Sequence, residues 1–94
     1  MQNYRHFYVT TFDPRDKVPG LRTRLLRQRD PAHYFATTDE VVAIIKSATP
    51  QAAGRAYKQA RHVAAVLNRY ARSHRDNVPQ AVLAEVPGLM GGTL

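Results

Sequence analysis

The sequence predicts a mostly helical, small α+β fold with one short N-terminal β-strand and one long amphipathic helix in the C-terminal half. Three observations predict it: aromatic and β-branched residues alternate near the N-terminus, helix-capping residues precede two apolar segments, and one long stretch has helical periodicity. The chain has 94 residues, 44% of them hydrophobic, which suits one core. We therefore expect a single domain over residues 1–94, with residues 88–94 as a flexible tail.

The strand is expected between Asn3 and Phe12, where successive side chains alternate between two faces. A single strand needs a partner, and the other candidate in the chain is the short segment "HYFAT" at residues 33–37. If that pairing fails, the strand is expected to pair with a copy of itself, which would make the protein a homodimer.

Two helices are expected next. The first covers Pro19 to Arg29, with leucines directed inward, and ends before Pro31, because a residue before proline is disfavoured in helical geometry. The second begins at Thr37, which has capping-box spacing to Glu40, and continues through about residue 47. Both helices would contribute to a helical core.

The long helix begins after Thr49 and Pro50, an N-cap residue followed by proline in the first turn. Its apolar positions recur at spacings of three and four to about His74. A last short helix, "PQAVLAEV", is expected over residues 79–86. These two elements would complete the core.

The long helix has one apolar face and one basic face. The apolar face carries Ala53, Ala56, Tyr57, Ala60, Val63, Ala64, Leu67, Tyr70 and Ala71, and the basic face carries Arg55, Lys58, Arg61, His62, Arg69 and Arg72. No acidic residue stands between Glu40 and Asp76, whereas an ordinary solvated helix mixes charges of both signs. The basic face is therefore expected to bind a polyanion.

The segment from Thr37 to Arg61 resembles a helix-turn-helix unit, in which the second helix enters the major groove of DNA. The resemblance implies that Gln51, Arg55 and Lys58 meet base edges, with Arg61 and His62 nearer the phosphates. A long helix lying across phosphates, and a plain helical hairpin with no role in groove recognition, are the alternatives.

Charge and composition indicate the class of partner. Fourteen Lys and Arg outnumber seven Asp and Glu, giving a formal net charge of +7, which attracts nucleic acid. The chain has no cysteine, no apolar run of membrane-spanning length and no signal-like N-terminus, so we expect a cytoplasmic protein without membrane contact.

Catalysis is not expected. Four histidines are scattered along the chain, and no acid–base pair, metal-ligand cluster or glycine-rich phosphate loop is recognisable, so no enzyme activity, metal or cofactor is predicted. A small ribonuclease-like toxin using His62 and Arg61 is the third alternative, after the two binding functions described next.

The favoured function is a small basic nucleic-acid-binding protein, with DNA preferred over RNA, acting as a regulator or accessory protein of bacterial, phage or plasmid origin. The expected contacts are Gln51, Arg55, Lys58, Arg61, His62, Arg69 and Arg72, with further phosphate contacts from Arg22, Arg24, Arg27 and Arg29. The alternative is a phage-type inhibitor or adaptor that binds an acidic surface of a host protein or nucleoprotein complex.

Overall fold

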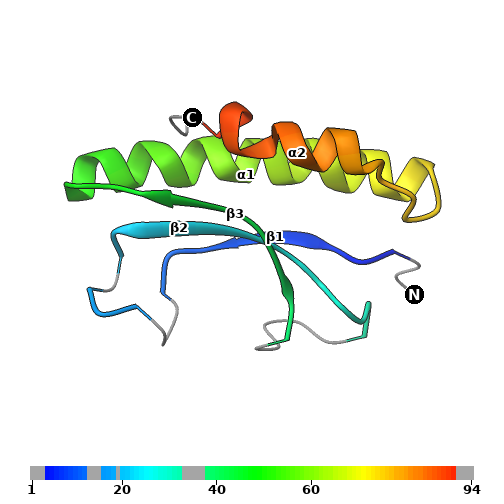
Figure 1. Cartoon of the computed structure of the whole chain (residues 1–94), viewed down its shortest axis with the longest axis horizontal. Helices are drawn as coiled ribbons and strands as arrows, with labels where there is room; N and C mark the ends of the chain where they lie inside the picture. The colour runs from blue at the N-terminus through cyan, green and yellow to red at the C-terminus, as the bar shows by residue number, and fades with distance from the viewer. Residues whose placement is uncertain (1–3, 13–15, 19, 33–37, 91–94) are drawn as a thin grey trace.

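The protein is an α+β fold in which a three-stranded antiparallel sheet carries two helices on one face (Figure 1). The computed structural model describes residues 4–12, 16–18, 20–32 and 38–90. In chain order the elements are β1 (Phe7–Thr10), β2 (Arg22–Arg27), β3 (Glu40–Lys46), α1 (Pro50–Ser73) and α2 (Gln80–Leu89). The sheet order is β1-β2-β3. The predicted mostly helical fold with one strand is therefore wrong.

Strand β2 occupies the segment that was predicted as the first helix. It forms the centre of the sheet and is buried on both faces, so Leu25 and Leu26 are both inside although they point to opposite sides. Arg24 and Arg27 are buried as well. Arginine is rarely buried without a partner, so the arginines of this segment were expected on the surface. The leucines then formed only a thin apolar stripe, which is typical of a basic amphipathic helix.

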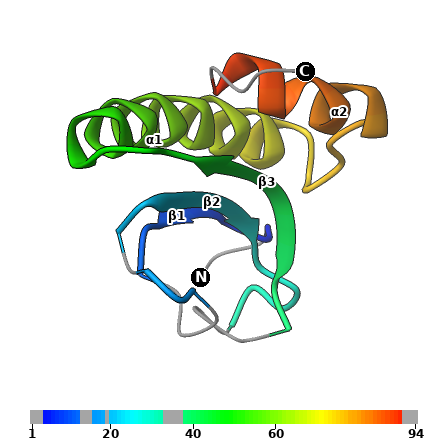
Figure 2. The ribbon, with the colours of Figure 1, turned by 60° about the vertical axis from the view of Figure 1, so that its left-hand side comes forward.

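Strand β3 replaces the second predicted helix, and its β-branched residues Val41, Val42, Ile44 and Ile45 are typical of strands. The expected capping residue Thr37 lies outside the described residues, and Glu40 is the first residue of β3. The pairing of β3 with β2 shifts between Leu25 and Leu26, and β3 curves around the sheet (Figure 2). Because a strand precedes α1, the helix-turn-helix prediction is wrong.

Strand β1 confirms the prediction of an N-terminal strand, with shorter bounds than expected. It pairs with β2 inside the chain, where Phe7 lies opposite Arg27 and Thr10 opposite Arg24. The partner predicted at residues 33–37 lies outside the described residues. Pairing with β2 removes the reason for expecting a dimer through this strand.

At Phe7, a side chain from α1 covers the outer edge of β1. The Phe7 amide donates to Asn68 Oδ1 at 2.7 Å, and Asn68 Nδ2 donates to the Phe7 carbonyl at 2.9 Å. Asn68 thus takes up both backbone groups of Phe7 that a further strand would use.

Helix α1 has almost the predicted bounds. The Thr49 hydroxyl accepts a hydrogen bond from the Ala52 amide at 3.1 Å, and Pro50 stands in the first turn, where its missing N–H costs nothing. At 24 residues the helix is about 36 Å long, and it runs along the longest dimension of the molecule, 37 Å. It ends near His74, whose ring stacks on Tyr70 at 4.0 Å.

Helix α2 follows a turn through Arg75 and Asp76, both with positive φ, and lies beside α1 over β3. The predicted short helix is confirmed here. Gly88 belongs to α2 and Met90 is buried, whereas the flexible tail was expected to begin at residue 88; its flexibility stays a prediction. Residues 91–94 lie outside the described part of the chain.

The core lies between the sheet and the two helices. The sheet contributes Phe7, Leu25 and Ala43, and the helices contribute Ala60, Val63, Ala64, Leu67, Ala71, Leu83 and Val86, followed by Met90. Burying a side chain such as Leu25 stabilises the fold by about 2 kcal/mol. The small alanines of α1 let it approach the sheet closely, which fixes the direction of its opposite, basic face.

Candidate nucleic-acid interface

The apolar face of α1 packs as predicted. Ala53, Ala56, Ala60, Val63, Ala64, Leu67 and Ala71 are buried. The two tyrosines at the edges differ: Tyr70 is half-buried and stacks on His74, whereas Tyr57 is 36% exposed. The packing of this face leaves the opposite face toward solvent along the whole helix.

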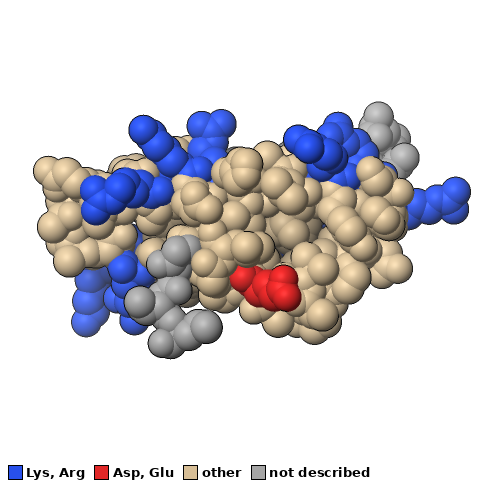
Figure 3. All heavy atoms as spheres, turned by 90° about the horizontal axis from the view of Figure 1, so that it is seen from above, with Lys and Arg blue, Asp and Glu red and all other residues tan. Residues whose placement is uncertain are grey.

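Every predicted site residue of α1 is exposed, namely Gln51, Arg55, Lys58, Arg61, His62, Arg69 and Arg72. We call this set the α1 basic face. Seen from above, Lys and Arg atoms lie along the long edge of the molecule that α1 forms, with a further group at the lower left and acidic atoms toward the opposite edge (Figure 3). Within residues 4–12, 16–18, 20–32 and 38–90, no carboxylate forms a salt bridge with this face. The positive charge is therefore not neutralised by the described part of the protein.

The cations of the α1 basic face are spread along the helix axis. From Arg55 to Arg72 they cover about 26 Å, the axial length of about 8 base pairs, which carry about 15 phosphates on the two strands together. Lys58 and Arg69 are about 16 Å apart along the axis, enough to reach phosphates on either side of a major groove about 12 Å wide. The face matches the scale of a duplex.

The arginines of β2 occupy a different environment. Arg24 NH1 lies 2.6 Å from Asp16 Oδ2, with 7% of the Arg24 side chain exposed, and Arg22 NH1 lies 3.4 Å from the other oxygen of that carboxylate. Arg29 is exposed, and its Nε donates to the Thr38 carbonyl. The predicted cluster of phosphate contacts on residues 22–29 is therefore divided: Arg24 is engaged in the fold, and Arg22 and Arg29 remain accessible.

Arg27 belongs to a second, partly buried ion-pair network, which the sequence did not indicate. Its NH2 group donates to Asp76 Oδ1 at 3.0 Å and to the Asp76 carbonyl at 2.9 Å, while its guanidinium lies 5.2 Å from the Phe7 ring centroid. Arg5 donates to the same carboxylate through Nε at 2.7 Å and through its amide at 3.2 Å. Arg27 therefore joins β2 to the turn after α1.

The environment of Asp76 lowers its pKa. Burial alone would raise the pKa of this carboxyl, but hydrogen bonds from Arg5 and Arg27 outweigh that effect and bring the pKa below its usual value. Asp76 is also one of two non-glycine residues with positive φ in the described chain, at 68°. Nothing in the sequence indicated its partners Arg5 and Arg27, which are 71 and 49 residues away in the chain.

A groove of about 270 Å³ lies between β1 and α1, lined by residues of β1 and by Tyr57, Arg61 and Asn68 of α1. His6 forms part of it and contacts Asn68 Nδ2 at 3.3 Å. Desolvation by burial lowers the pKa of His6, and the positive charge of Arg72 lowers it further. The imidazole therefore senses the charge at the C-terminal end of the α1 basic face.

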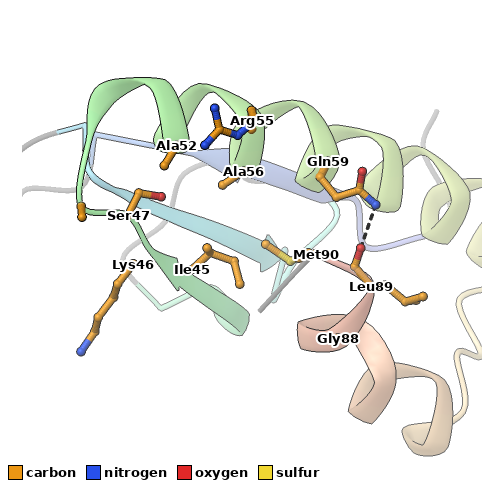
Figure 4. A pocket seen from close by; sticks show the side chains of 11 residues that line it. Ile45, Lys46, Ser47, Ala52, Arg55, Ala56, Gln59, Gly88, Leu89 and Met90 are labelled. Atoms are coloured by element: carbon orange, nitrogen blue, oxygen red, sulfur yellow. Dashed lines mark hydrogen bonds between the residues drawn. The ribbon is translucent and has the colours of Figure 1, made fainter. Parts of the chain in front are cut away.

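A larger groove of about 630 Å³ lies between the end of β3, the first half of α1 and the end of α2 (Figure 4). Its floor is apolar, with Ile45 and Met90 among the lining residues, and Gln59 Nε2 donates to the Leu89 carbonyl at 2.8 Å. Lys46 extends away from it (Figure 4). Its polar groups do not converge on one point, as a catalytic or small-ligand site would require.

No cluster of three or more His, Asp or Glu side chains able to hold a metal ion occurs in the described ranges. Among those same residues, the helices are not long and apolar enough for any of them to cross a membrane. Comparison with known protein families, with curated proteins and with solved structures finds no match to this chain.

Proposed function

We propose that this protein binds nucleic acid, with duplex DNA as its preferred ligand, through the α1 basic face. One observation carries the proposal: the exposed cations from Arg55 to Arg72 have no carboxylate partner among the described residues. A row of like charges destabilises a helix unless an anion is present to neutralise it. Phosphates of nucleic acid supply such charge at regular spacing.

The proposed mode of binding is a helix lying across the sugar–phosphate backbone. Strand β3 stands directly before α1, so no first helix of a recognition unit is available to hold the N-terminus of α1 in the major groove. The cations are instead spread along the whole length of α1. In this mode most of the affinity comes from phosphate contacts, and sequence preference is weak.

Arginine and exposed polar groups suit this role. Arg55, Arg61 and Arg69 offer forked donors that match phosphate oxygens, and Gln51 can contact a base edge or a phosphate near the start of α1. Arg22 and Arg29, which remain accessible on β2 and after it, are the further contacts of the proposal. A regulator or accessory protein of bacterial, phage or plasmid DNA is the biological role we propose.

The proposal is tested by fluorescence-anisotropy titration of labelled duplex DNA, single-stranded DNA and RNA at two salt concentrations. Arg55→Glu with Arg69→Glu should abolish binding, because it reverses two charges of the α1 basic face. The matched control is Lys17→Glu with Lys46→Glu, which changes net charge equally at two exposed residues outside α1. The control should keep most of the affinity, and the stoichiometry gives the number of copies on the duplex.

Three results would contradict the proposal. Absence of binding by the unmodified protein at low salt would favour an acidic protein surface as the partner. Equal loss in both double variants would reduce the effect to net charge, without a specific face. Cleavage of the probe would favour the ribonuclease alternative.

A further inference from the structure

Gly54 lies in the interior of α1 and is exposed, a place where glycine is less favourable than alanine because of its backbone entropy. A Cβ at this position would have no atom within 4 Å. The φ of Gly54 does not lie in the left-handed region. Among the glycines of the described residues, Gly20 is the one with a positive φ. Neither packing nor backbone conformation in the described protein therefore requires glycine at position 54.

The surface around Gly54 is hollowed. A depression of about 500 Å³ is lined by Gly54, Tyr57, Lys58, Arg61 and His62. Helical side chains lean toward the N-terminus of their helix, so those of Tyr57 and Lys58 extend back on either side of Gly54. Since glycine has no side chain, the helix backbone forms the floor between them.

The walls of this depression combine an aromatic ring with cations. Tyr57 is 36% exposed, and the guanidinium of Arg61 lies 5.8 Å from the centroid of its ring. Lys58 and His62 are exposed beside it and have no salt bridge to a described carboxylate. A phosphate flanked by a sugar fits this combination, because cations take the phosphate and the ring packs on the sugar.

We propose that a nucleic-acid strand crosses α1 at Gly54, with its sugar–phosphate backbone seated between Tyr57 and Lys58. This inference rests on the proposed function and names the point of closest approach within the α1 basic face. Glycine is needed there because a methyl group would keep the phosphate away from the helix backbone and from the cations around it.

The test is Gly54→Ala, measured by thermal unfolding and by anisotropy titration with a random-sequence duplex of about 20 base pairs, roughly twice the length that α1 spans. The melting temperature should rise by about 4 °C, because alanine is the better helix former. The affinity for the duplex should nevertheless fall about tenfold, as for the loss of one charge-assisted hydrogen bond. Gain of stability with loss of binding separates this effect from misfolding.

The matched control is Gly88→Ala, the same substitution at an exposed glycine of α2 where a Cβ also meets nothing within 4 Å. Its affinity should equal that of the unmodified protein. Tyr57→Ala should weaken binding as Gly54→Ala does, while Tyr57→Phe, which keeps the ring, should retain it. If the unmodified protein binds duplex and Gly54→Ala binds equally well, the crossing point is overturned and the proposed function stands. If the unmodified protein does not bind at low salt, both are overturned.

Discussion

Arg27 in β2 and Asp76 in the turn after α1 stand 49 residues apart in the chain and meet through a hydrogen bond of 3.0 Å. Only 6% of the Arg27 side chain is exposed, against 22% for Asp76, so the guanidinium depends on this carboxylate for its charge partner. The pair links the turn at the C-terminal end of α1 to the central strand β2. Its contribution to folding can be measured.

Asp76→Asn removes the charge but keeps a side chain that tolerates the positive φ of this position. Arg27 is then left buried without a counter-charge, and because Asp76 is partly exposed we expect the free energy of unfolding to fall by about 2 kcal/mol. The measurement is urea unfolding followed by circular dichroism. Glu85→Gln is the control, because Glu85 is exposed and forms no salt bridge with a described residue; its effect should stay below about 0.5 kcal/mol. Equal effects would show that the pair has no special weight.

Acid should weaken the fold through the same carboxylate. The pKa of Asp76 is lowered in the folded protein, so the unfolded chain binds a proton first as the pH falls. Its stabilising contribution is therefore complete above the ordinary value of 3.8 and is lost as the pH falls through the lowered pKa. Melting temperatures recorded between about pH 6 and pH 2 should fall less steeply below pH 4 in Asp76→Asn than in the unmodified protein. Parallel curves would assign the acid sensitivity to other groups.

The elements that sequence predicted well are those whose signals are local. Thr49 and Pro50 mark the start of α1 within one turn, and the spacing of its alanines gives the buried face without knowledge of the partner. The exposed cations of α1 follow from the same periodicity. The candidate interface on α1 was therefore predictable, since one helix carries both faces.

The central strand was not predictable in the same way, because its environment is built from distant residues. Arg24 and Arg27 look like surface cations until Asp16 and Asp76 are placed beside them. For β3 the β-branched residues were the better guide, but the spacing of Thr37 to Glu40 suggested a helix start. Because of these two errors, strands β2 and β3 were predicted as helices.

His6 should report on binding at the other end of the α1 basic face. Its pKa is lowered by burial and by the charge of Arg72, so the folded protein binds the proton less readily than the unfolded chain. A phosphate placed on Arg72 neutralises that charge, and the pKa of His6 should rise when duplex DNA is added. The measurement is an NMR titration of the imidazole with and without duplex.

Arg72→Gln should raise the pKa of His6 in the free protein and reduce its further rise on binding. Lys17→Gln, on another part of the surface, should leave both unchanged. An unchanged pKa in the complex would place the DNA away from Arg72.

The salt dependence of binding should count the cations that meet phosphates. Arg55, Lys58, Arg61, Arg69 and Arg72 form five candidate contacts, and each phosphate neutralised releases counterions with a slope of about −0.9 in log K against log salt. If all five engage, the slope should be about −4.5, and changing any one of them to glutamine should reduce it by about 0.9. Anisotropy titrations at four or more salt concentrations give the slope for each variant, with Lys17→Gln as the exposed cation outside α1.

Gly54→Ala should behave differently from the charge variants. It should lower the affinity mainly by increasing the distance between one phosphate and the helix backbone, while most phosphate contacts persist. Its slope should therefore stay closer to that of the unmodified protein. A slope near zero, or a slope that the glutamine variants of α1 leave unchanged, would mean that the cations of α1 do not contact phosphates. An equal reduction in Lys17→Gln would mean that Lys17 meets phosphates as well, which would contradict binding through the α1 basic face alone.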